Sequence, residues 1–256
     1  VGLPDNAIKE SNYRIAAALQ NNHYRIPGKT IIINMSPAAL RKEGSAYDLT
    51  LALGILSASG QIKSESIEDY LIMGELSLDG SVLPIKGALP IAIKAKQEGY
   101  KGFILPIQNA REASIVDNFK VFGVSNISEV INFFDKYQQL SATTINTERE
   151  LNKNLEFFEY DFSDVKGQES IKRCMEIAAA GGHNLILIGP PGSGKTMLAK
   201  RLPSILPPMT VVESLETTKI HSVAGKLGTS EGLISTRPFR SPHHTISDVA
   251  LVGGGQ

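Results

Sequence analysis

The sequence has a single cysteine, no net charge and no long apolar run, and each of these features excludes a class of site or protein. Cys174 alone can form neither an internal disulfide nor a cysteine-rich zinc site, which is typical of a reducing compartment such as the cytoplasm. Because 26 basic residues balance 26 acidic ones, the composition disfavours nucleic-acid binding through bulk positive charge and leaves a local basic patch open. No stretch approaches the roughly 20 apolar residues of a membrane span, and we expect no membrane association.

What is present is an ordinary globular composition over 256 residues, with 42% hydrophobic and 20% charged residues. This length suggests two domains or one large one. The chain begins at Val1 without an initiator methionine or a signal core and ends in a glycine-rich run. We therefore expect it to be an internal piece of a longer chain.

The first half alternates helical and strand-like patterns. The patterns predict helices over 4–20, 48–58, 87–98, 110–116 and 127–137, and strands over 30–33, 102–106 and 120–124. Two alternating runs in 71–84 surround Asp79-Gly80, which predicts a hairpin. The expected fold is a compact α/β domain over residues 1–137.

Residues 138–157 are polar and lack periodicity, which predicts a linker, although an exposed helix from 147 to 157 is an alternative. After it we expect a helix over 170–180, a buried parallel strand over 184–188 and a helix that begins at Lys195. The length of that last helix is limited by Pro203, Pro207 and Pro208. Cys174 falls within the first of these helices and is expected to be a buried structural thiol.

The chemistry is concentrated where that strand meets the helix. The segment fits G-x-x-x-x-G-K-[ST] at every fixed position, with the residues Gly189, Pro190, Pro191, Gly192, Ser193, Gly194, Lys195 and Thr196. Its glycines let successive backbone N–H groups face phosphate oxygens, and the helix that follows adds its positive N-terminal end. Lys195 is predicted to contact the β- and γ-phosphates of ATP, and the Thr196 hydroxyl to bind Mg²⁺.

Hydrolysis requires more than this loop. It needs an acidic residue at the end of a second apolar strand, and usually an arginine from a neighbouring subunit. No apolar run ending in Asp-Glu occurs in 197–256, and Asp248 is a poor match. We therefore expect this chain to bind nucleotide better than it hydrolyses it.

Three further segments carry a family resemblance. Residues 164–168 (DVKGQ) resemble the segment that precedes the phosphate loop in AAA+ ATPases. Residues 236–245 (TRPFRSPHHT) and 251–255 (LVGGG) resemble the magnesium-chelatase-like branch, and within it the YifB/ComM family of bacterial ATPases. The resemblance implies that Val165 and Gly167 lie beside the adenine. It also implies that residues 158–256 form the first part of an AAA+ domain that ends before the acidic Walker B strand.

The N-terminal half resembles the Lon-type proteolytic domain, through residues 41–48 and 73–87. Both catalytic positions of that domain are changed, because Ala46 occupies the nucleophile position and Leu89 the lysine position. Ser45 and Lys86 lie close in sequence to these positions but are displaced by one and three residues. We expect a scaffold or interaction domain and not an active protease.

The segment containing Arg237, Arg240, His243 and His244 is punctuated by proline and lacks apolar periodicity. It could contact the phosphates of DNA, or it could pack against a neighbouring subunit, and the sequence leaves both open. Two adjacent histidines without further ligands do not indicate a metal site.

Taken with the resemblance, these patterns indicate a cytoplasmic, ATP-binding AAA+ ATPase that forms a ring, expected to be a hexamer, and remodels or translocates DNA. In the family this activity is branch migration during natural transformation. Two alternatives remain, a motor subunit that drives magnesium insertion into a porphyrin and an ATP-gated binding module without catalysis of its own.

Overall fold

The structure is a computed structural model, and it describes residues 6–37, 42, 44–63, 65–152, 158–228, 232–242, 245–247, 249 and 253. The chain divides into two compact units. The first unit comprises residues 1–147 and 215–233, and the second comprises residues 148–214 and 234–256.

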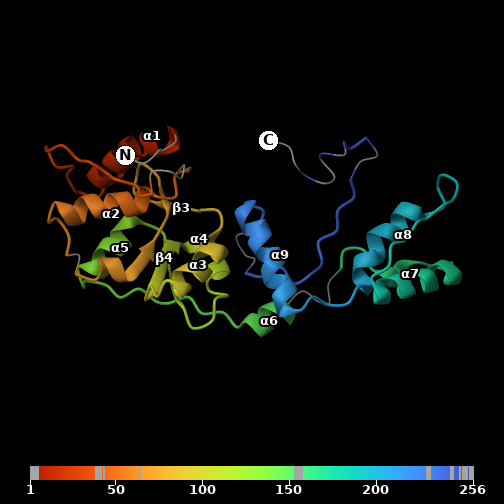
Figure 1. Cartoon of the computed structure of the whole chain (residues 1–256). Helices are drawn as coiled ribbons and strands as arrows, with labels where there is room; N and C mark the ends of the chain where they lie inside the picture. The colour runs from red at the N-terminus through yellow and green to blue at the C-terminus, as the bar shows by residue number, and fades with distance from the viewer. Residues whose placement is uncertain are drawn as a thin grey trace. The chain divides into compact units, whose positions relative to one another are not determined.

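The first unit begins with two helices and continues with alternating strands and helices (Figure 1). In chain order these are α1 (Asn6–Asn21), α2 (Asp48–Ala58), the 3-10 turn η1 (Ile67–Asp69), β1 (Tyr70–Ile72), β2 (Glu75–Leu76), β3 (Val82–Leu83), α3 (Ala88–Gln97), β4 (Gly102–Pro106), α4 (Ile107–Ala113), β5 (Lys120–Val124) and α5 (Ile127–Phe134). The remaining elements are α6 (Thr147–Asn152), η2 (Phe162–Asp164), α7 (Glu169–Gly181), α8 (Lys195–Arg201), η3 (Leu202–Ile205) and α9 (Val211–Val223).

A three-stranded parallel sheet, in the order β1-β4-β5, forms the centre of the first unit. Phe103 of β4 lies opposite Leu71 on one side and Val121 on the other. Every residue of the central strand β4 is buried. A continuous apolar run of this kind is what a parallel strand covered on both faces requires.

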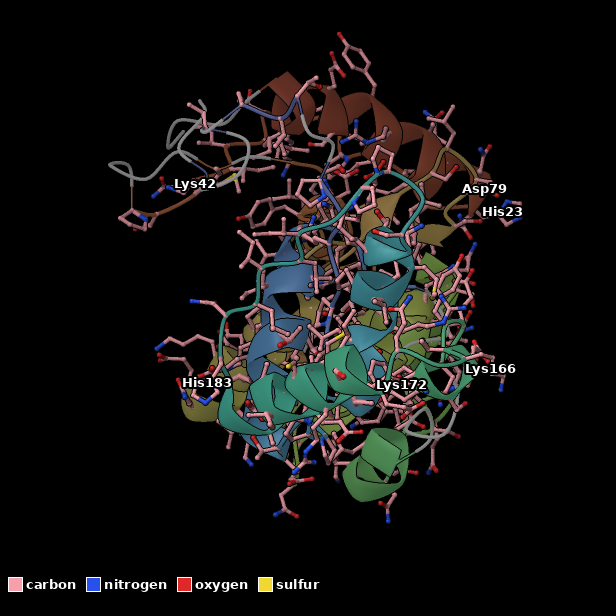
Figure 2. All side chains as sticks on the ribbon, turned by 90° about the vertical axis from the view of Figure 1, so that its right-hand side faces the viewer. His23, Lys42, Asp79, Lys166, Lys172 and His183 are labelled. Carbon is pink, nitrogen blue, oxygen red and sulfur yellow. The ribbon has the colours of Figure 1, made fainter. Side chains whose placement is uncertain are left out.

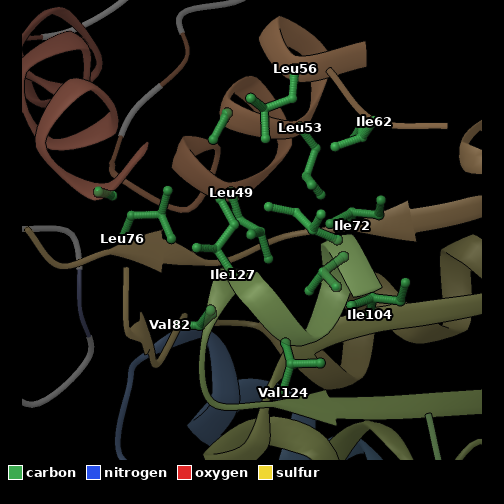
Figure 3. Close-up of a cluster of buried hydrophobic side chains, with 14 of the residues drawn as sticks. Leu49, Leu53, Leu56, Ile62, Ile72, Leu76, Val82, Ile104, Val124 and Ile127 are labelled. Carbon is green, nitrogen blue, oxygen red and sulfur yellow. The ribbon is translucent and has the colours of Figure 1, made fainter. Parts of the chain in front are cut away.

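Alternation along the strands divides the core into two layers. Phe103, Leu105 and Val121 pack with the small residues of α3 and α4 on one face of the sheet. Ile104 and Val124 face the other way and pack with α1, α2 and α5. Figure 3 shows this second layer, in which Leu49, Leu53 and Leu56 of α2 lie over residues of the strands. The α/β fold expected from the sequence is thus present.

The predicted hairpin over 71–84 is only partly correct. β2 and β3 pair antiparallel, with Leu76 opposite Val82, and Gly80 takes a φ of +90° at the turn. The residues before Glu75 belong instead to β1 of the parallel sheet. The first apolar run is therefore divided between two sheets.

Most other elements of the first unit match the prediction. The helices over 4–20, 48–58, 87–98 and 127–137 and the strands over 102–106 and 120–124 are confirmed with small shifts at their ends. The helix expected over 110–116 begins earlier, at Ile107. Asn126 begins α5 with a capping box, because its side chain accepts from Ser128 N while Glu129 accepts from Asn126 N.

Two predicted strands are wrong. Residues 30–33 form no strand, and Ile31 and Ile32 are 41% and 78% exposed. Residues 184–188 form none either, and Ile186 and Ile188 are 80% and 88% exposed. An apolar run becomes a buried strand only when a neighbouring strand satisfies its backbone, and neither segment pairs with any strand in the described part of the chain.

Two features of the second half also depart from expectation. Cys174 is exposed and not buried, because α7 turns Met175, Ala178 and Ala179 inward and leaves the thiol outside. Helix α9 was not predicted, because its buried positions Ser214, Thr218 and Ser222 are hydroxyl residues and give no apolar period. Among the described residues no helix combines the length and the apolar character that crossing a membrane demands.

Candidate nucleotide-binding site

The candidate site is the loop of residues 189–196, which leads into α8. Gly192 and Gly194 have φ of +80° and +84°, a conformation that L side chains rarely adopt. Gly194 is the N-cap residue of α8, and its carbonyl accepts from Leu198 N at 2.9 Å. The two glycines therefore allow the tight curvature that the motif predicts at this point.

Lys195 is the first residue of α8, and its side chain reaches back to the loop. Its Nζ donates to the carbonyl oxygens of Gly189 and Pro190, both at 2.8 Å, and lies 3.3 Å from Ser193 Oγ. Thr196, the next residue, is exposed to solvent. The primary ammonium group and the hydroxyl thus follow one another along α8, beside the loop backbone.

Residues 161–168, here called the lead-in segment, pack against the same helix. Phe162 and Val165 form one buried cluster with Met175 of α7 and Leu198 of α8. A Cβ placed on Gly194 would lie 3.9 Å from the side-chain Nε2 of Gln168. The structure therefore brings Val165, a predicted site residue, to the helix that carries Lys195. Gly167, the other predicted residue of this segment, directly precedes Gln168 in the chain.

Polar contacts fix the lead-in segment in this position. Phe162 N donates to Ser204 Oγ at 2.9 Å, and Arg201 Nη2 lies 3.3 Å from the Asp164 carboxylate. The Arg201 guanidinium also lies 5.5 Å from the centre of the Tyr160 ring. Hydrogen bonds from Ser163 lower the pKa of Asp161, whose side chain caps η2. In Figure 2, Lys166 of this segment is labelled together with Lys172 near the start of α7 and His183 beyond its end.

The predicted contact segment around Arg237 is engaged inside the second unit. Arg237 Nε donates to Pro207 O at 2.9 Å, and its Nη2 lies 3.0 and 3.2 Å from the two Glu213 oxygens. Glu213 also accepts from Thr210 N at 2.8 Å, which forms a capping box at the start of α9. This backbone hydrogen bond, followed by the Arg237 contact, lowers the pKa of Glu213.

The other members of that segment differ from Arg237. Arg240 is exposed, and it forms no ion pair or side-chain hydrogen bond with any residue that the structure describes. His243, His244 and Asp248 lie outside the described residues. The structure thus describes two of the four predicted contact residues. Arg237 is paired with Glu213, and Arg240 is exposed.

Metal ligands are sparse in the described part of the chain, where no group of three His, Cys, Asp or Glu side chains could hold an ion. Mg²⁺ commonly binds through few protein ligands together with substrate phosphates and water. A single exposed hydroxyl at Thr196 beside a phosphate loop is compatible with that mode of binding.

The two positions that the sequence comparison predicts for the Lon catalytic pair lie in the first unit and carry no reactive group. Leu89 is fully buried, and Ala46 packs against the cluster of α3 and α4. Ser45 Oγ donates to the Glu75 carboxylate, whereas the Lys86 side chain lies over Gly225. No hydrogen bond joins Ser45 to Lys86.

Sequence reasoning missed Gln168, Arg201 and Glu213, which position the site and the neighbouring segment. Glu213 could have been found, because Thr210 and Glu213 have the spacing of a capping box. Arg201 gives no comparable signal, since its contacts to Asp164 and Tyr160 join residues about 40 positions apart.

Comparison with known proteins shows two family matches that together cover most of the chain. Residues 161–256 match the family described as magnesium chelatase, subunit ChlI. Residues 1–109 match the family described as subunit ChlI of Mg-chelatase.

Several proteins are similar over the whole chain. An uncharacterised protein of Mycobacterium tuberculosis is 44% identical over 257 residues, which cover all of this chain and 50% of the relative. Competence protein ComM of Haemophilus influenzae is 41% identical over 260 residues, again 100% of this chain and 50% of the relative. YifB of Salmonella typhimurium, itself uncharacterised, is 42% identical over 257 residues, 100% of this chain and 49% of the relative. The chain therefore spans about half the length of these relatives.

A weaker similarity is confined to part of the chain. Lon protease of Mycoplasma mycoides is 31% identical over 108 residues, which cover 42% of this chain and 13% of that protein.

Proposed function

Because the chain belongs to the YifB/ComM family of magnesium-chelatase-like AAA+ proteins, we propose that residues 189–196 bind the triphosphate of ATP together with Mg²⁺. The observation that carries this proposal is the placement of Lys195. Its ammonium group lies 2.8 Å from two carbonyl oxygens of the loop, on a helix that begins at the glycine with a φ of +84°. A cation held over a glycine-rich turn fits the charge and size of a phosphate chain.

Each residue of the proposed site has a distinct role. Lys195 pairs with the β- and γ-phosphate oxygens, and the loop N–H groups donate to them. The Thr196 hydroxyl binds Mg²⁺, which when bound neutralises part of the phosphate charge. The residues Val165 and Gly167 border the base, because Val165 is packed onto the helix that carries the lysine.

We propose ATP hydrolysis as the activity of the whole protein, with this chain alone binding nucleotide and releasing phosphate slowly. Hydrolysis needs an acidic group that positions Mg²⁺ and water, and the sequence of residues 197–256 contains no apolar run that ends in Asp-Glu. Phosphate release by the 256-residue chain at a rate typical of AAA+ ATPases would contradict this part of the proposal.

Calorimetric titration of ATP with Mg²⁺ tests the site. The Lys195→Ala variant should bind at least about tenfold more weakly, because it loses charge-assisted hydrogen bonds to phosphate. Lys226→Ala is the matched control, since Lys226 is exposed in the first unit and its side chain forms no hydrogen bond or ion pair with any described residue. Equal affinities for wild type and Lys195→Ala would refute the proposed site.

We further propose DNA as the substrate, which rests on the competence name of one relative and on the exposed Arg240. Arg237 is not proposed as a phosphate contact, because Glu213 already balances its charge. Arg240→Glu should weaken DNA binding. It should also reduce the magnitude of the negative slope of log affinity against log salt by about 1. Lys226→Glu, with the same charge change, should leave both nearly unaltered.

The description of both matching families favours a second candidate, a motor subunit for magnesium insertion into a porphyrin. Stimulation of ATP hydrolysis in the whole protein by a porphyrin and not by branched DNA would select it. Stimulation by neither would select an ATP-gated binding module.

Our proposal for the rest of the chain keeps the organisation expected from sequence. Residues 1–137 form a Lon-like domain that acts as a scaffold and not as a protease, 138–157 link it, and 158–256 begin the ATPase domain. The whole protein works as a cytoplasmic ring, a hexamer in which a neighbour supplies the arginine for hydrolysis. A serine-directed phosphonate that labelled Ser45 would contradict the scaffold role.

A further inference from the structure

Gln168 is the last residue of the lead-in segment, and its backbone has a conformation that glutamine rarely adopts. The φ of Gln168 is +55°, and Gly167 before it has a φ of +69°. Glycine enters this left-handed region freely, whereas a residue with a long side chain is strained there. Residues held in such conformations concentrate at binding and catalytic sites. The strain at Gln168 therefore directs attention to what its side chain does.

The backbone of Gln168 has a structural role, whereas its side chain has no partner among the described residues. Its carbonyl oxygen accepts from Ile171 N and Lys172 N, both at 3.0 Å, where α7 begins. The side-chain amide does not cap α7, and it forms no hydrogen bond with any residue that the structure describes. Because Gln168 is exposed, a ligand can reach this amide.

The Gln168 amide lies beside the phosphate loop. Its Nε2 is 3.9 Å from the position that a Cβ on Gly194 would occupy, and Gly194 is the N-cap residue of α8. Along the chain, Gln168 follows Val165 and Gly167, which are proposed to border the base. Gln168 thus joins the proposed base segment to the loop that is proposed to enclose the phosphates.

This position selects one part of the nucleotide. In ATP the α-phosphate connects the ribose and base to the β- and γ-phosphates, so a donor between the base segment and the loop lies where that group is expected. Glu169, the next residue along the chain, pairs with Lys172 at 3.1 Å, and its negative charge is therefore balanced. A free amide N–H beside the loop suits a charged phosphate oxygen as its acceptor.

We propose that the Gln168 side-chain amide donates a hydrogen bond to the α-phosphate of the bound nucleotide. The proposal rests on the proposed nucleotide site, and it adds a ligand residue that the phosphate-loop motif does not contain. The hydrogen bond formed on binding offsets the strain of the left-handed backbone at this residue.

Asparagine at this position separates the role of the amide from that of the backbone. It adopts the left-handed conformation more readily than glutamine and keeps the amide, but its side chain is one methylene shorter. The stability of Gln168→Asn in urea should therefore equal or exceed that of wild type. In calorimetric titrations of the 256-residue chain with Mg²⁺, this variant should bind ADP and ATP about five- to tenfold more weakly than wild type, by the same factor for both.

Gln168→Glu tests the charge of the group that is contacted. A carboxylate has nearly the shape of the amide, but it only accepts hydrogen bonds and it repels phosphate. The affinity of this variant for ADP and ATP should fall at least as far as that of Gln168→Asn.

Gln139→Asn is the matched control. Gln139 is exposed in the first unit, and its side chain forms no hydrogen bond with any described residue. This variant should bind both nucleotides as tightly as wild type.

The other outcomes overturn the proposal. Wild-type affinity in Gln168→Asn shows that the amide contacts no part of the nucleotide, and lower stability of that variant shows that the amide supports the fold instead. Weakened binding by Gln168→Asn with full affinity in Gln168→Glu assigns the contact to a ribose hydroxyl, because a hydroxyl can donate to a carboxylate. A loss confined to ATP assigns it to the γ-phosphate.

The Lys195→Ala variant separates failure of this proposal from failure of the nucleotide site. If Lys195→Ala loses affinity while the Gln168 variants do not, the α-phosphate contact is refuted and the proposed site stands. A wild-type chain that binds neither ADP nor ATP refutes both.

Discussion

At the residue scale, two arginines that lie close together in the sequence have different surroundings in the structure. Arg237 and Arg240 are three residues apart, and the sequence predicts the same two possible roles for both, contact with DNA or with a neighbouring subunit. The structure pairs Arg237 with Glu213 and Pro207 O, and leaves Arg240 exposed. Sequence spacing alone could not separate them, because the acidic partner lies 24 residues earlier.

Glu213 makes the pairing sensitive to pH. Its pKa is below the ordinary value, chiefly because the carboxylate accepts from Thr210 N and then from Arg237. A lowered folded-state pKa adds stability above the ordinary glutamate pKa of about 4.3, and this stability is lost as the pH falls through the folded-state value. The free-energy difference between wild type and Glu213→Gln, measured by urea unfolding, should therefore shrink on acidification.

The control for this measurement is Glu216→Gln, which changes an exposed position of the same helix. Its difference from wild type should be small at every pH. If the wild-type advantage over Glu213→Gln stayed constant down to the lowest pH at which the protein remains folded, the assigned contacts would be incorrect.

At the element scale, the sequence was informative for segments whose apolar side chains pack against a neighbour within the same unit. The central strand β4 is a continuous apolar run, and α2 has three leucines facing the sheet, so both were predictable. Residues 30–33 and 184–188 have the same apolar character but no strand beside them in the described chain. An apolar run is compatible with a buried strand, but it forms one only when another strand lies beside it and pairs with its backbone.

Helix α9 shows the opposite failure. Its buried positions are hydroxyl residues, and Ile220 and Val223 are 69% and 61% exposed. The spacing of apolar residues in α9 therefore does not indicate which face of the helix is buried. Ser214 Oγ donates to Ile234 O instead, so hydrogen bonding and not apolar burial holds that face.

Two glycines test whether these elements are packed as described. Gly102 lies in β4, where a Cβ would stand 2.9 Å from both Lys120 O and the Phe122 ring. Gly102→Ala should therefore lower the free energy of unfolding by about 1–3 kcal/mol. Gly54 is an exposed position within α2 and a Cβ there meets nothing within 4 Å.

Gly54→Ala should raise the free energy of unfolding by about 0.5–1 kcal/mol, because alanine is the better helix former. Both values come from chemical denaturation. Destabilisation by Gly54→Ala, or a neutral Gly102→Ala, would show that the helix or the strand is packed differently.

At the scale of the whole molecule, the family could be identified from sequence while much of the mechanism could not. The motif of residues 189–196 and the segments around 164–168 and 236–245 identify it, and relatives similar over the whole chain agree. The chain covers about half of those relatives, so activity, substrate and assembly stand as proposals for the whole protein.

The candidate site itself was predictable in part. A fixed motif predicts Lys195 and the curved loop, because glycine and lysine act there through the backbone and through charge. Arg201 pairs with Asp164 of the lead-in segment, and this contact depends on how that segment packs on α8, which no local pattern specifies.

The central claim is that the backbone between Gly189 and Thr196 encloses the phosphates of ATP. Amide hydrogen exchange of the chain, with and without ATP and Mg²⁺, measures this directly. We expect slower exchange at the non-proline amides of 189–196 and at Gly167, with unchanged exchange in the strands of the first unit, and no such change in Lys195→Ala. ATP binding that slowed exchange elsewhere while leaving these amides unaffected would contradict the account.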